Sequence, residues 1–534
     1  MALTYFSQAP LRRDQTQLFY PTLEDSISED HPVRVLDELL DSCDFSEWEQ
    51  HYHGSRGQPP HPPRALAKVL LYALSRSIRS SRLIEYAMGH NMDFMWLAEG
   101  RIFDHSTLCE FRTRFGPELK ALFRQLGRLA LTLGLVRLNQ ITFDGTRVRA
   151  NNSRMGTLTA AAIEERLKEL DQQLTDYLQE SAAADQADQE HLPGPTNSIP
   201  PQLADLNARQ EALKQALATV QAMDEERRKN QGINPAKNPA QLPETDGDSR
   251  VMQSKEGGYA PNYTPLAAVD VDGDFIVAVS VINAPTEHTE TLAIVEQITE
   301  DFGKQPEQLL MDCHHATGQN IAAFENSGTE LISPLPTTPR KSEASNPALR
   351  PDPTQPVPEE QWDKLPRNPQ YKKLDKSCFV YDAENDLYRC PQGEALPFEE
   401  TKSEPLASGR IVKFRVYRCA ACASCPLREQ CVSPKSKDGR TIRRDEFTEQ
   451  RERHAAKMAT TEAKAAYKKR LHSGEVIFAH IKQVMGLRQF LLRGLDKVNL
   501  EWLWTCTSYN VYKLVRFLMG LRNQSALDAS AEPA

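Results

Sequence analysis

The chain has 534 residues, 40% of them apolar and 26% charged, which is typical of a soluble globular protein with about three domains of roughly 150 residues each. No apolar run approaches the roughly 20 residues of a membrane helix, and residues 1–6 lack the basic region of a signal peptide, so a cytoplasmic protein is expected. The net charge of −9 argues against a nucleic-acid-binding protein, but this charge is unevenly distributed.

Two segments of the chain are basic and one is acidic. Residues 101–154 hold ten Lys and Arg against four Asp and Glu, a net charge of +6, and residues 435–497 hold sixteen against eight, a net charge of +8. Residues 161–250 hold nine against seventeen, a net charge of −8. The pattern favours a local basic surface for nucleic acid, and ordinary solvated helix faces are the alternative.

Residues 1–135 are predicted to be helical. Amphipathic stretches over 33–40, 65–78 and 119–133 are separated by Pro and Gly. A fourth stretch from Ser106 to Phe115 begins with Ser and Thr, which cap helices well. This all-α region is a candidate DNA-binding module.

The pattern changes from helices to strands at Leu138. Residues 140–144 alternate in polarity and end on Asp144, and residues 309–311 form an apolar strand ending on Asp312. A hairpin is predicted over 266–281, around an Asp-Gly turn. The same reasoning predicts a helix over 289–302, a helix from 318 and a strand over 330–334.

Two long insertions interrupt this alternation. Heptad spacing over 163–178 and 203–220 predicts an antiparallel helical hairpin. Residues 336–375 are rich in Pro, Ser and charge and are predicted to be a linker, and a cysteine-bearing, β-rich stretch follows over 376–434. Long helices are predicted over 446–482 and 496–520.

The expected fold class is therefore α/β. The element order predicts a ribonuclease H-like core, a mixed sheet flanked by helices, interrupted by a helical-hairpin insert and a cysteine-rich insert and preceded by an all-α N-terminal domain. The expected boundaries are 1–135 for the N-terminal region; 136–157, 245–335 and 446–520 for the core; 158–244 for the helical insert; 336–445 for the linker and cysteine-rich insert; and 521–534 for a disordered tail.

Asp144 and Asp312 are the first candidate catalytic residues, because each carboxylate ends an apolar strand. Acids at strand ends and on an adjacent helix can hold two divalent ions about 3.5–4 Å apart, which activate a nucleophile and stabilise the leaving oxygen in phosphodiester cleavage. Mg²⁺ prefers such oxygen ligands. The alternative for either acid is a turn or a helix cap.

Five short motifs stand out along the chain. They are Asp144-Gly145-Thr146-Arg147-Val148-Arg149-Ala150-Asn151; Arg79-Ser80-Ser81-Arg82-Leu83-Ile84-Glu85; Asp104-His105-Ser106-Thr107 with Phe111-Arg112; Asp248-Ser249-Arg250 with Gly258-Tyr259 and Asn262-Tyr263; and Tyr467, Arg470, Glu475 and Lys482, followed by Arg493-Gly494-Leu495 and Tyr509-Asn510. These motifs resemble those of bacterial insertion-sequence DDE transposases, in the branch whose last motif is Tyr–Arg–Glu–Lys. The resemblance covers nearly the whole chain.

The resemblance implies a transposase that binds the terminal inverted repeats of its element as a dimer, cleaves there, and joins the freed 3′ ends to target DNA. It implies that Asp144, Asp312 and Glu475 hold two Mg²⁺ ions. The residues assigned to DNA contact are Tyr467, Arg470, Lys482, Arg147, Arg112 and Arg114.

Helix geometry supports the assignment of the last motif, and two departures from the family's usual motifs weaken the assignment of the acids. At about 100° per residue, Glu475 and Lys482 lie about 20° apart, so the last motif can face one groove. However, four residues separate Arg470 from Glu475, where the commonest form of the motif has three. Asp312 is followed by Cys-His-His, where relatives usually have small residues, Gly and an aromatic. Asp270 is therefore the alternative second acid, and an inactive DNA-binding copy or a nuclease without strand transfer is the alternative function.

The cysteines over 390–431 predict a structural metal site. Closely spaced thiols in a cytosolic chain favour tetrahedral Zn²⁺, and the repeated two-residue gaps also suit an iron–sulfur cluster. Four of the following five would be ligands: Cys390, Cys419, Cys422, Cys425 and Cys431. Cys378 and Cys506 are expected in the core, and His314 and His315 at the surface or beside the site rather than as ligands.

Overall fold

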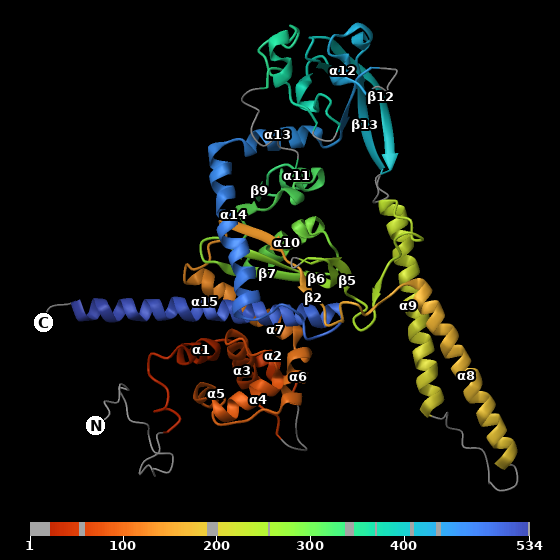
Figure 1. The fold of residues 1–534 in the computed structure, drawn as a ribbon. Coiled ribbons are helices and arrows are strands. Elements are labelled where there is room, and N and C mark those ends of the chain that lie inside the picture. Colours follow the sequence, from red (N-terminus) through yellow and green to blue (C-terminus); the bar gives the residue numbers. More distant parts are fainter. Residues whose placement is uncertain are drawn as a thin grey trace, which may run out of the picture.

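The computed structural model describes residues 22–52, 59–188, 201–254, 257–336, 346–368, 371–405, 411–433 and 439–531. Figure 1 shows helices of the N-terminal region at one end, a central sheet, a projecting helical hairpin and a β-rich domain at the opposite end. None of the described helices is both long and apolar enough to cross a membrane. The structure is mixed α/β, as predicted.

The N-terminal region is helical, as the sequence predicted. Its helices are α1 (Pro32–Asp41), α2 (Ser46–Glu49), α3 (Pro63–Ser75), α4 (Ser81–His90), α5 (Met92–Leu97), α6 (His105–Arg114) and α7 (Gly116–Thr132). Pro stands in the first turn of α1, α3 and α7, where its missing N–H has no cost. Asp104 caps α6 by accepting a hydrogen bond from the Ser106 amide.

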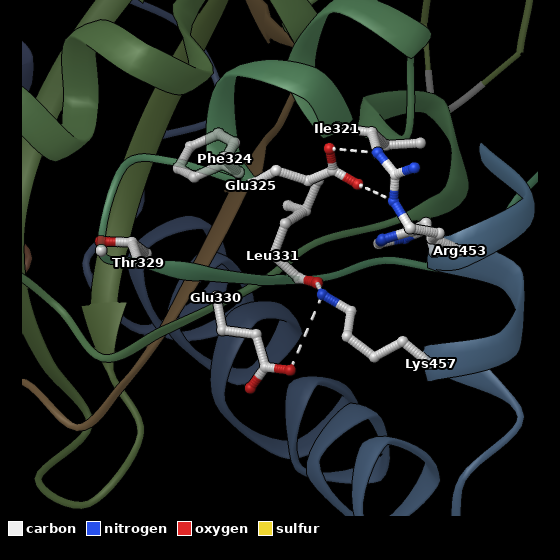
Figure 2. A pocket seen from close by; sticks show the side chains of 10 residues that line it. Ile321, Phe324, Glu325, Thr329, Glu330, Leu331, Arg453 and Lys457 are labelled. Carbon is white, nitrogen blue, oxygen red and sulfur yellow. Dashed lines mark hydrogen bonds and ion pairs between the residues drawn. The ribbon is translucent and has the colours of Figure 1, made fainter. Parts of the chain in front are cut away.

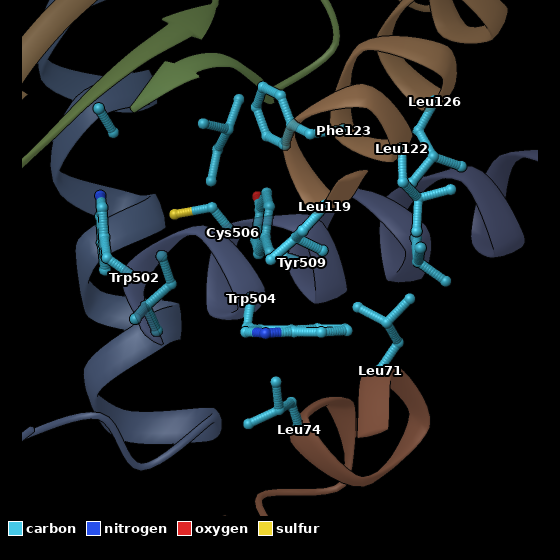
Figure 3. Close-up of a cluster of buried hydrophobic side chains, with 14 of the residues drawn as sticks. Leu71, Leu74, Leu119, Leu122, Phe123, Leu126, Trp502, Trp504, Cys506 and Tyr509 are labelled. Carbon is cyan, nitrogen blue, oxygen red and sulfur yellow. The ribbon is translucent and has the colours of Figure 1, made fainter. Parts of the chain in front are cut away.

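Helix α15 (Leu495–Ala531) joins these helices to the sheet. It packs against α1, α3, α6 and α7 on one side and against β7 (Phe275–Ile282) on the other. Trp502 Nε1 donates to Leu266 O (2.9 Å) and Trp504 Nε1 to Arg112 O (3.0 Å). Figure 3 shows the apolar cluster where α15 meets α3 and α7. The helix continues through 521–531, so the expected disordered tail is wrong over those residues.

The central sheet has the order β7-β6-β1-β8-β9. Its strands are β1 (Gln140–Gly145), β6 (Tyr259–Asp270), β7, β8 (Gln308–Leu310) and β9 (Glu330–Ile332), and the short strands β2 (Val148–Arg149) and β5 (Arg250–Gln253) pair with the start of β6. β7, β6 and β1 are antiparallel neighbours, whereas β1, β8 and β9 are parallel. Every strand predicted for this part of the chain is confirmed.

Helices follow the strands as expected. α10 (Thr291–Phe302) packs on β7 and α7, and ends at Gly303 with a left-handed φ of 68°. After β8, the 3₁₀ turn Cys313–His315 leads into α11 (Gly318–Phe324), which Thr317 caps. These elements confirm the predicted helix over 289–302 and the helix from 318.

The first insert is a helical hairpin that projects from the body. Figure 1 shows α8 (Ala160–Asp188) and α9 (Pro201–Gln231) side by side as a long arm. A small apolar cluster at the base of the arm includes Ile163 and Val220 and holds the two helices together. The two short strands β3 (Thr157–Leu158) and β4 (Leu242–Pro243) pair where the arm leaves the core.

The second insert forms a separate β-rich domain. Its five antiparallel strands are β10 (Val380–Asp382), β11 (Leu387–Arg389), β12 (Ala395–Pro405), β13 (Ile411–Arg418) and β14 (Thr441–Asp445), with the short helix α12 (Arg428–Cys431). Ala348, Val357 and Leu365 lie in the core of this domain. The linker predicted over 336–375 is therefore wrong from residue 348 onward, because these apolar side chains pack rather than connect. Residues 337–345 lie outside the described part.

The predicted helix over 446–482 is three elements. α13 (Thr448–Met458) and α14 (Thr461–Ala479) are separated by a short break, at which Thr460 caps α14 through the Ala463 amide. A π-helical turn, His480–Val484, follows α14. The angular spacing of an α-helix therefore stops at Ala479, so the calculation that placed Glu475 and Lys482 on one face does not hold.

Candidate functional site

Parallel pairing of β1 and β8 brings two of the predicted acids to one edge of the sheet. Thr142 lies opposite Leu310 in the strand register, and Asp144 and Asp312 each follow two residues later. Neighbouring strands are about 4.8 Å apart, so the chain carries both acids to the same edge of the sheet. Their side chains are 22% and 32% exposed, which leaves both accessible from solvent.

Helix α14 crosses this edge with one face against the strands. A Cβ added at Gly474 would lie 3.8 Å from Asp144 Oδ2 and 3.9 Å from Thr142 Oγ1, so the helix backbone rests on the end of β1. One turn earlier, Arg470 Nη2 donates to Asp144 Oδ2 (3.0 Å). Tyr467, on the same face, packs beside Leu310, and burial raises its pKa.

Glu475 lies one residue beyond this packed face and is exposed. In the commonest form of the resembling motif the glutamate stands four residues after the arginine. In this chain that position is Gly474, the residue that touches Asp144. The extra residue turns the carboxylate of Glu475 by about 100° around the helix axis.

The three predicted acids do not meet as a preformed metal-binding cluster. Among the described residues, the one set of three or more His, Cys, Asp or Glu ligand atoms that lie mutually within 4.8 Å is Glu85, Asp104 and His105. These three residues lie at the surface between α4 and α6, where His105 Nδ1 is 3.0 Å from Glu85 Oε2. The structure thus places Asp144 and Asp312 together and leaves Glu475 on the adjoining helix.

Two residues that the sequence analysis did not select as ligands lie beside the acids. A Cβ added at Gly145 would lie 2.5 Å from Glu287 Oε1, so Gly145 leaves room for that carboxylate. His315 is 3% exposed, and its Nε2 lies 3.8 Å from Glu287 Oε2 and 3.9 Å from Asp312 Oδ1. Burial lowers the pKa of His315 to about 4. The three-residue spacing of Asp312 and His315 could have indicated that these side chains lie together, whereas nothing in the local sequence around Glu287 indicated its position beside the acids.

Asp270, the alternative second acid, lies at the other end of β1. It pairs with Ile141, three positions before Asp144. Its buried carboxylate accepts hydrogen bonds from the amides of Leu138 (2.8 Å) and Gly273 (3.0 Å) and also from those of Arg137 and Asp272. Burial raises the pKa of Asp270. The geometry gives this acid the task of fixing the β6–β7 turn.

Two of the predicted DNA-contacting cations are held by protein groups in this structure. Lys482 Nζ donates to Thr146 Oγ1 (2.6 Å) and to Arg147 O (2.8 Å). Arg147 Nη1 donates to Thr264 Oγ1 (2.5 Å) and lies 3.7 Å from Glu287 Oε1. Both residues therefore stabilise the chain just after Asp144.

The two arginines predicted on α6 have different surroundings. Arg112 is only 7% exposed and donates to Arg79 O (3.0 Å), while Arg79 pairs with Glu501 on α15 (2.7 Å). Burial lowers the pKa of Arg112. Arg114 is 44% exposed and lies over the Tyr52 ring. Of the two, Arg114 is placed to reach a ligand at the surface.

An exposed basic strip lies on α14. Lys464, Lys468 and Lys469 are exposed along this helix, and Lys469 Nζ donates to Gln140 Oε1 (2.8 Å). Figure 1 shows the acidic arm formed by α8 and α9 on the far side of the sheet from α14. The acidic insert is thus separated from the basic helix beside Asp144.

Helix α13 anchors this basic helix to the edge strand β9. Figure 2 shows a cavity of about 340 Å³ bounded by α11, β9 and α13. Within it, Arg453 Nη2 lies 2.9 Å from Glu325 Oε2, and Lys457 Nζ donates to Leu331 O (2.7 Å). Because these charged groups pair with each other, we assign the cavity to attachment of α13 rather than to a ligand.

The five predicted thiols line one cavity of the β-rich domain. Cys390, Cys419, Cys422, Cys425 and Cys431 surround a space of about 20 Å³. The Gln392 amide donates to Cys390 Sγ (3.3 Å) and the Arg440 amide to Cys422 Sγ (3.4 Å). A hydrogen bond with Cys419 lowers the pKa of Cys390 to about 7, whereas burial raises that of Cys431 to about 12. Cys378 and Cys506 are buried in apolar cores, as expected.

The chemistry of these thiols suits a metal ion. Amide-to-sulfur hydrogen bonds stabilise thiolates, and the cavity is too small for an organic cofactor. Among the described residues, no three of these sulfur atoms lie mutually within 4.8 Å, so the ligands would have to close around an ion.

Two family models match the chain. One, described as a transposase DDE domain, matches residues 389–515, and the other, described as a transposase domain (DUF772), matches residues 21–114. No curated protein matches the sequence. The first match spans much of the β-rich domain, α13, α14 and most of α15, and the second spans α1–α6. Both matches are to transposase families, and together they support a transposase.

Proposed function

We propose that this chain is a DDE transposase of the Tyr–Arg–Glu–Lys branch, built on a ribonuclease H-like core. The sheet order β7-β6-β1-β8-β9 supports this core, because its first two strand pairings are antiparallel and its last two are parallel. The N-terminal helices, the helical arm and the β-rich domain are then additions to it. The branch assignment depends on the motif residues, among which Tyr467 and Arg470 lie beside the acids.

The proposed reaction is metal-dependent cleavage of DNA at the element ends, followed by transfer of the 3′ ends to target DNA. The observation that supports it is the register of β1 and β8, whose ends lead into Asp144 and Asp312 at the edge of the sheet where α14 crosses. Two Mg²⁺ ions held by Asp144, Asp312 and Glu475 would activate the nucleophile and stabilise the leaving oxygen. Until the metal ions bind, the positive charge of Arg470 balances the negative charge of Asp144.

Glu475 needs a change at the end of α14 to join the other two acids. The π-helical turn directly after α14 is a natural place for such a change, because π-turns are locally less stable than α-helix and occur often at functional sites. Binding of DNA along the exposed lysines of α14 would act on the same helix.

The proposed DNA surface consists of Lys464, Lys468 and Lys469 with Arg114 of the N-terminal region. Terminal inverted repeats and target DNA are the partners, and a homodimer on DNA would pair the two element ends. The acidic arm lies across the sheet from α14, and this placement suits DNA binding because acidic groups within a Debye length of about 8–10 Å of a duplex would repel it.

The β-rich domain is proposed to hold one Zn²⁺ ion through four of Cys390, Cys419, Cys422, Cys425 and Cys431. The thiols would stabilise the domain rather than take part in chemistry, because they lie in a different domain from Asp144. An iron–sulfur cluster is the alternative occupant.

A second candidate function is a DNA-binding protein without catalysis. Two observations favour it: Asp144 is paired with Arg470, and Glu475 stands off the packed face of α14. A nuclease without strand transfer is the third candidate, which the motif on α14 disfavours.

One assay separates the three candidates. The full chain is incubated with Mg²⁺, a duplex carrying the DNA that flanks its gene, and a supercoiled target plasmid. We expect cuts at the repeat ends and covalent joining to the plasmid. Cuts without joining would support the nuclease, and specific binding without cuts would support the DNA-binding protein. Asp144→Asn serves as the control that should bind but not cut.

A further inference from the structure

Strand β9 is the last strand of the central sheet, and helix α13 covers its outer edge. The Glu307–Glu330 and Met311–Ile332 hydrogen bonds join β8 to β9, so the alternate carbonyls of β9 face outward. Two of these are Leu331 O and Ser333 O. Figure 2 shows Lys457 reaching Leu331, where its Nζ donates to the carbonyl (2.7 Å), and His454 Nε2 lies 2.7 Å from Ser333 O. The two donors are three residues apart, so one face of α13 supplies both.

The contact with Ser333 fixes the proton of His454. A carbonyl oxygen can only accept a hydrogen bond, so His454 Nε2 carries the proton and donates. His454 is 4% exposed, and burial lowers its pKa, which favours the neutral ring. A neutral donor thus holds the main chain of Ser333 at the end of β9 without burying a charge there.

The side chain of Ser333 continues the connection to Asp312. β8 and β9 still pair at Met311, whose amide donates to Ile332 O (3.0 Å). The residue after Ser333 is Pro334, which has no N–H to continue the ladder. The buried Ser333 hydroxyl donates to Asp312 O instead (2.5 Å). This hydroxyl therefore anchors the main chain from which the carboxylate of Asp312 projects.

Helix α13 is also joined to the third predicted acid. After a short break it is followed by α14, which carries Glu475. Ala463 of α14 lies in one apolar cluster with Leu310 of β8 and Ile332 of β9. The attachment of α13 at Ser333 therefore bears on the strand that leads to one acid and on the helix that carries another.

We propose that His454 and Ser333 are positioning residues for the catalytic metal site. His454 holds Ser333, and Ser333 holds the main chain of Asp312, so that the carboxylate meets the ion in one fixed direction. Neither His454 nor Ser333 touches the ion. The inference rests on the proposed function, because it takes Asp312 as a metal ligand, and it adds two residues that no motif indicated.

The dissociation constant for Mn²⁺ tests this role apart from the cleavage rate. Electron paramagnetic resonance follows free Mn²⁺ in a titration of the full chain bound to a duplex already cut at the element end. The constant should rise about tenfold or more in His454→Leu and in Ser333→Ala, because each removes a group that holds a metal ligand in place. His454→Gln keeps an N–H donor near the position of Nε2 and should restore most of the affinity.

Lys457→Met is the matched control. It removes a hydrogen bond between the same helix and the same strand, but at Leu331, which lies opposite Leu309 and not beside Asp312. This variant should bind Mn²⁺ as the wild type does. Because His454 acts through Ser333, the double variant His454→Leu, Ser333→Ala should bind Mn²⁺ no more weakly than the weaker of the two single variants.

Several results would overturn the inference. An equal loss of affinity in Lys457→Met would reduce the effect to the docking of α13, and losses that multiply in the double variant would show that the two residues act separately. If His454→Leu does not fold, Ser333→Ala decides, and unchanged Mn²⁺ affinity there excludes the role. A wild type that cleaves DNA while both single variants keep its Mn²⁺ affinity would overturn this inference alone. A wild type that neither binds Mn²⁺ nor cleaves would overturn the proposed function as well.

Discussion

The edge of the central sheet and the β-rich domain both gather potential metal ligands, but in opposite ways. At the sheet edge, Asp144 and Asp312 come from strands 168 positions apart in the chain and remain partly exposed. In the β-rich domain, four of the five thiols come from 13 consecutive residues, 419–431, and most are buried. The first site is open and its acid is paired with Arg470; the second is closed and lined with amide-to-sulfur hydrogen bonds.

The difference fits two roles for metal. Catalytic metal sites keep positions open for substrate, whereas structural sites are closed by protein ligands. An arginine that neutralises Asp144 can be displaced by a cation, so the sheet edge is suited to reversible binding. Buried thiols exchange slowly and contribute to folding. Metal removal should therefore stop chemistry at one region and destabilise the other.

Substitution of the acids should give the largest effect. Asp144→Asn and Asp312→Asn should each slow Mg²⁺-dependent cleavage at least about a thousandfold, with little change in DNA binding, because each removes a charge that holds the ion. Single-turnover cleavage measures the rate, and Asp272→Asn, an exposed acid on the β6–β7 turn, is the control. Equal loss in Glu475→Gln would support its place in the triad. Full activity in Asp312→Asn would contradict a catalytic role for the sheet edge.

Substitution of a thiol should affect stability rather than chemistry. Cys422→Ser should lose most of the bound Zn²⁺ and lower the melting temperature by about 10 °C, a loss of about 2 kcal/mol in a domain of this size. Metal analysis and calorimetry follow both quantities, and the exposed Cys109→Ser should match the wild type. About one metal per chain is expected. Neither zinc nor iron in the purified protein would refute the closed site.

Asp270 is expected to contribute to stability, in contrast to Asp144 and Asp312, which are expected to act in cleavage. Asp270→Asn should lower the free energy of unfolding by about 2–3 kcal/mol, because its carboxylate accepts four backbone amides and an Asn side chain cannot satisfy all of them. Denaturant unfolding gives the value. The cleavage rate per folded molecule should stay close to that of the wild type. A folded but inactive variant would restore Asp270 as the second acid.

Neutralising a surface lysine should give the smallest effect. Lys468→Ala should reduce the slope of log affinity against log salt by about one unit if the lysine meets a phosphate. Glu164→Gln, on the helical arm, should leave the slope unchanged. Binding titrations at several salt concentrations check both. A strong response in the arm with none on α14 would place the DNA surface elsewhere.

Local patterns predicted most of the elements, because helix caps, Pro and Gly positions and alternation act over a few residues. They also selected Asp144, Asp312 and the thiols, whose roles at a metal stay predictions. Glu287 was missed because its place beside Gly145 depends on the sheet and on the loop after β7. Packing explains the other differences: apolar residues from 348 onward enter the β-rich core, and the π-turn after Ala479 displaces Lys482 from the expected face.

We propose that the sheet edge, and not the thiol cavity, binds the cation used on DNA. An anomalous difference map of crystals of the chain with bound duplex and Mn²⁺ tests it most directly. We expect a manganese peak within about 2.1 Å of carboxylate oxygens of both Asp144 and Asp312, with Arg470 released from Asp144. No peak at these carboxylates, with the Arg470–Asp144 ion pair intact on bound DNA, would contradict the claim.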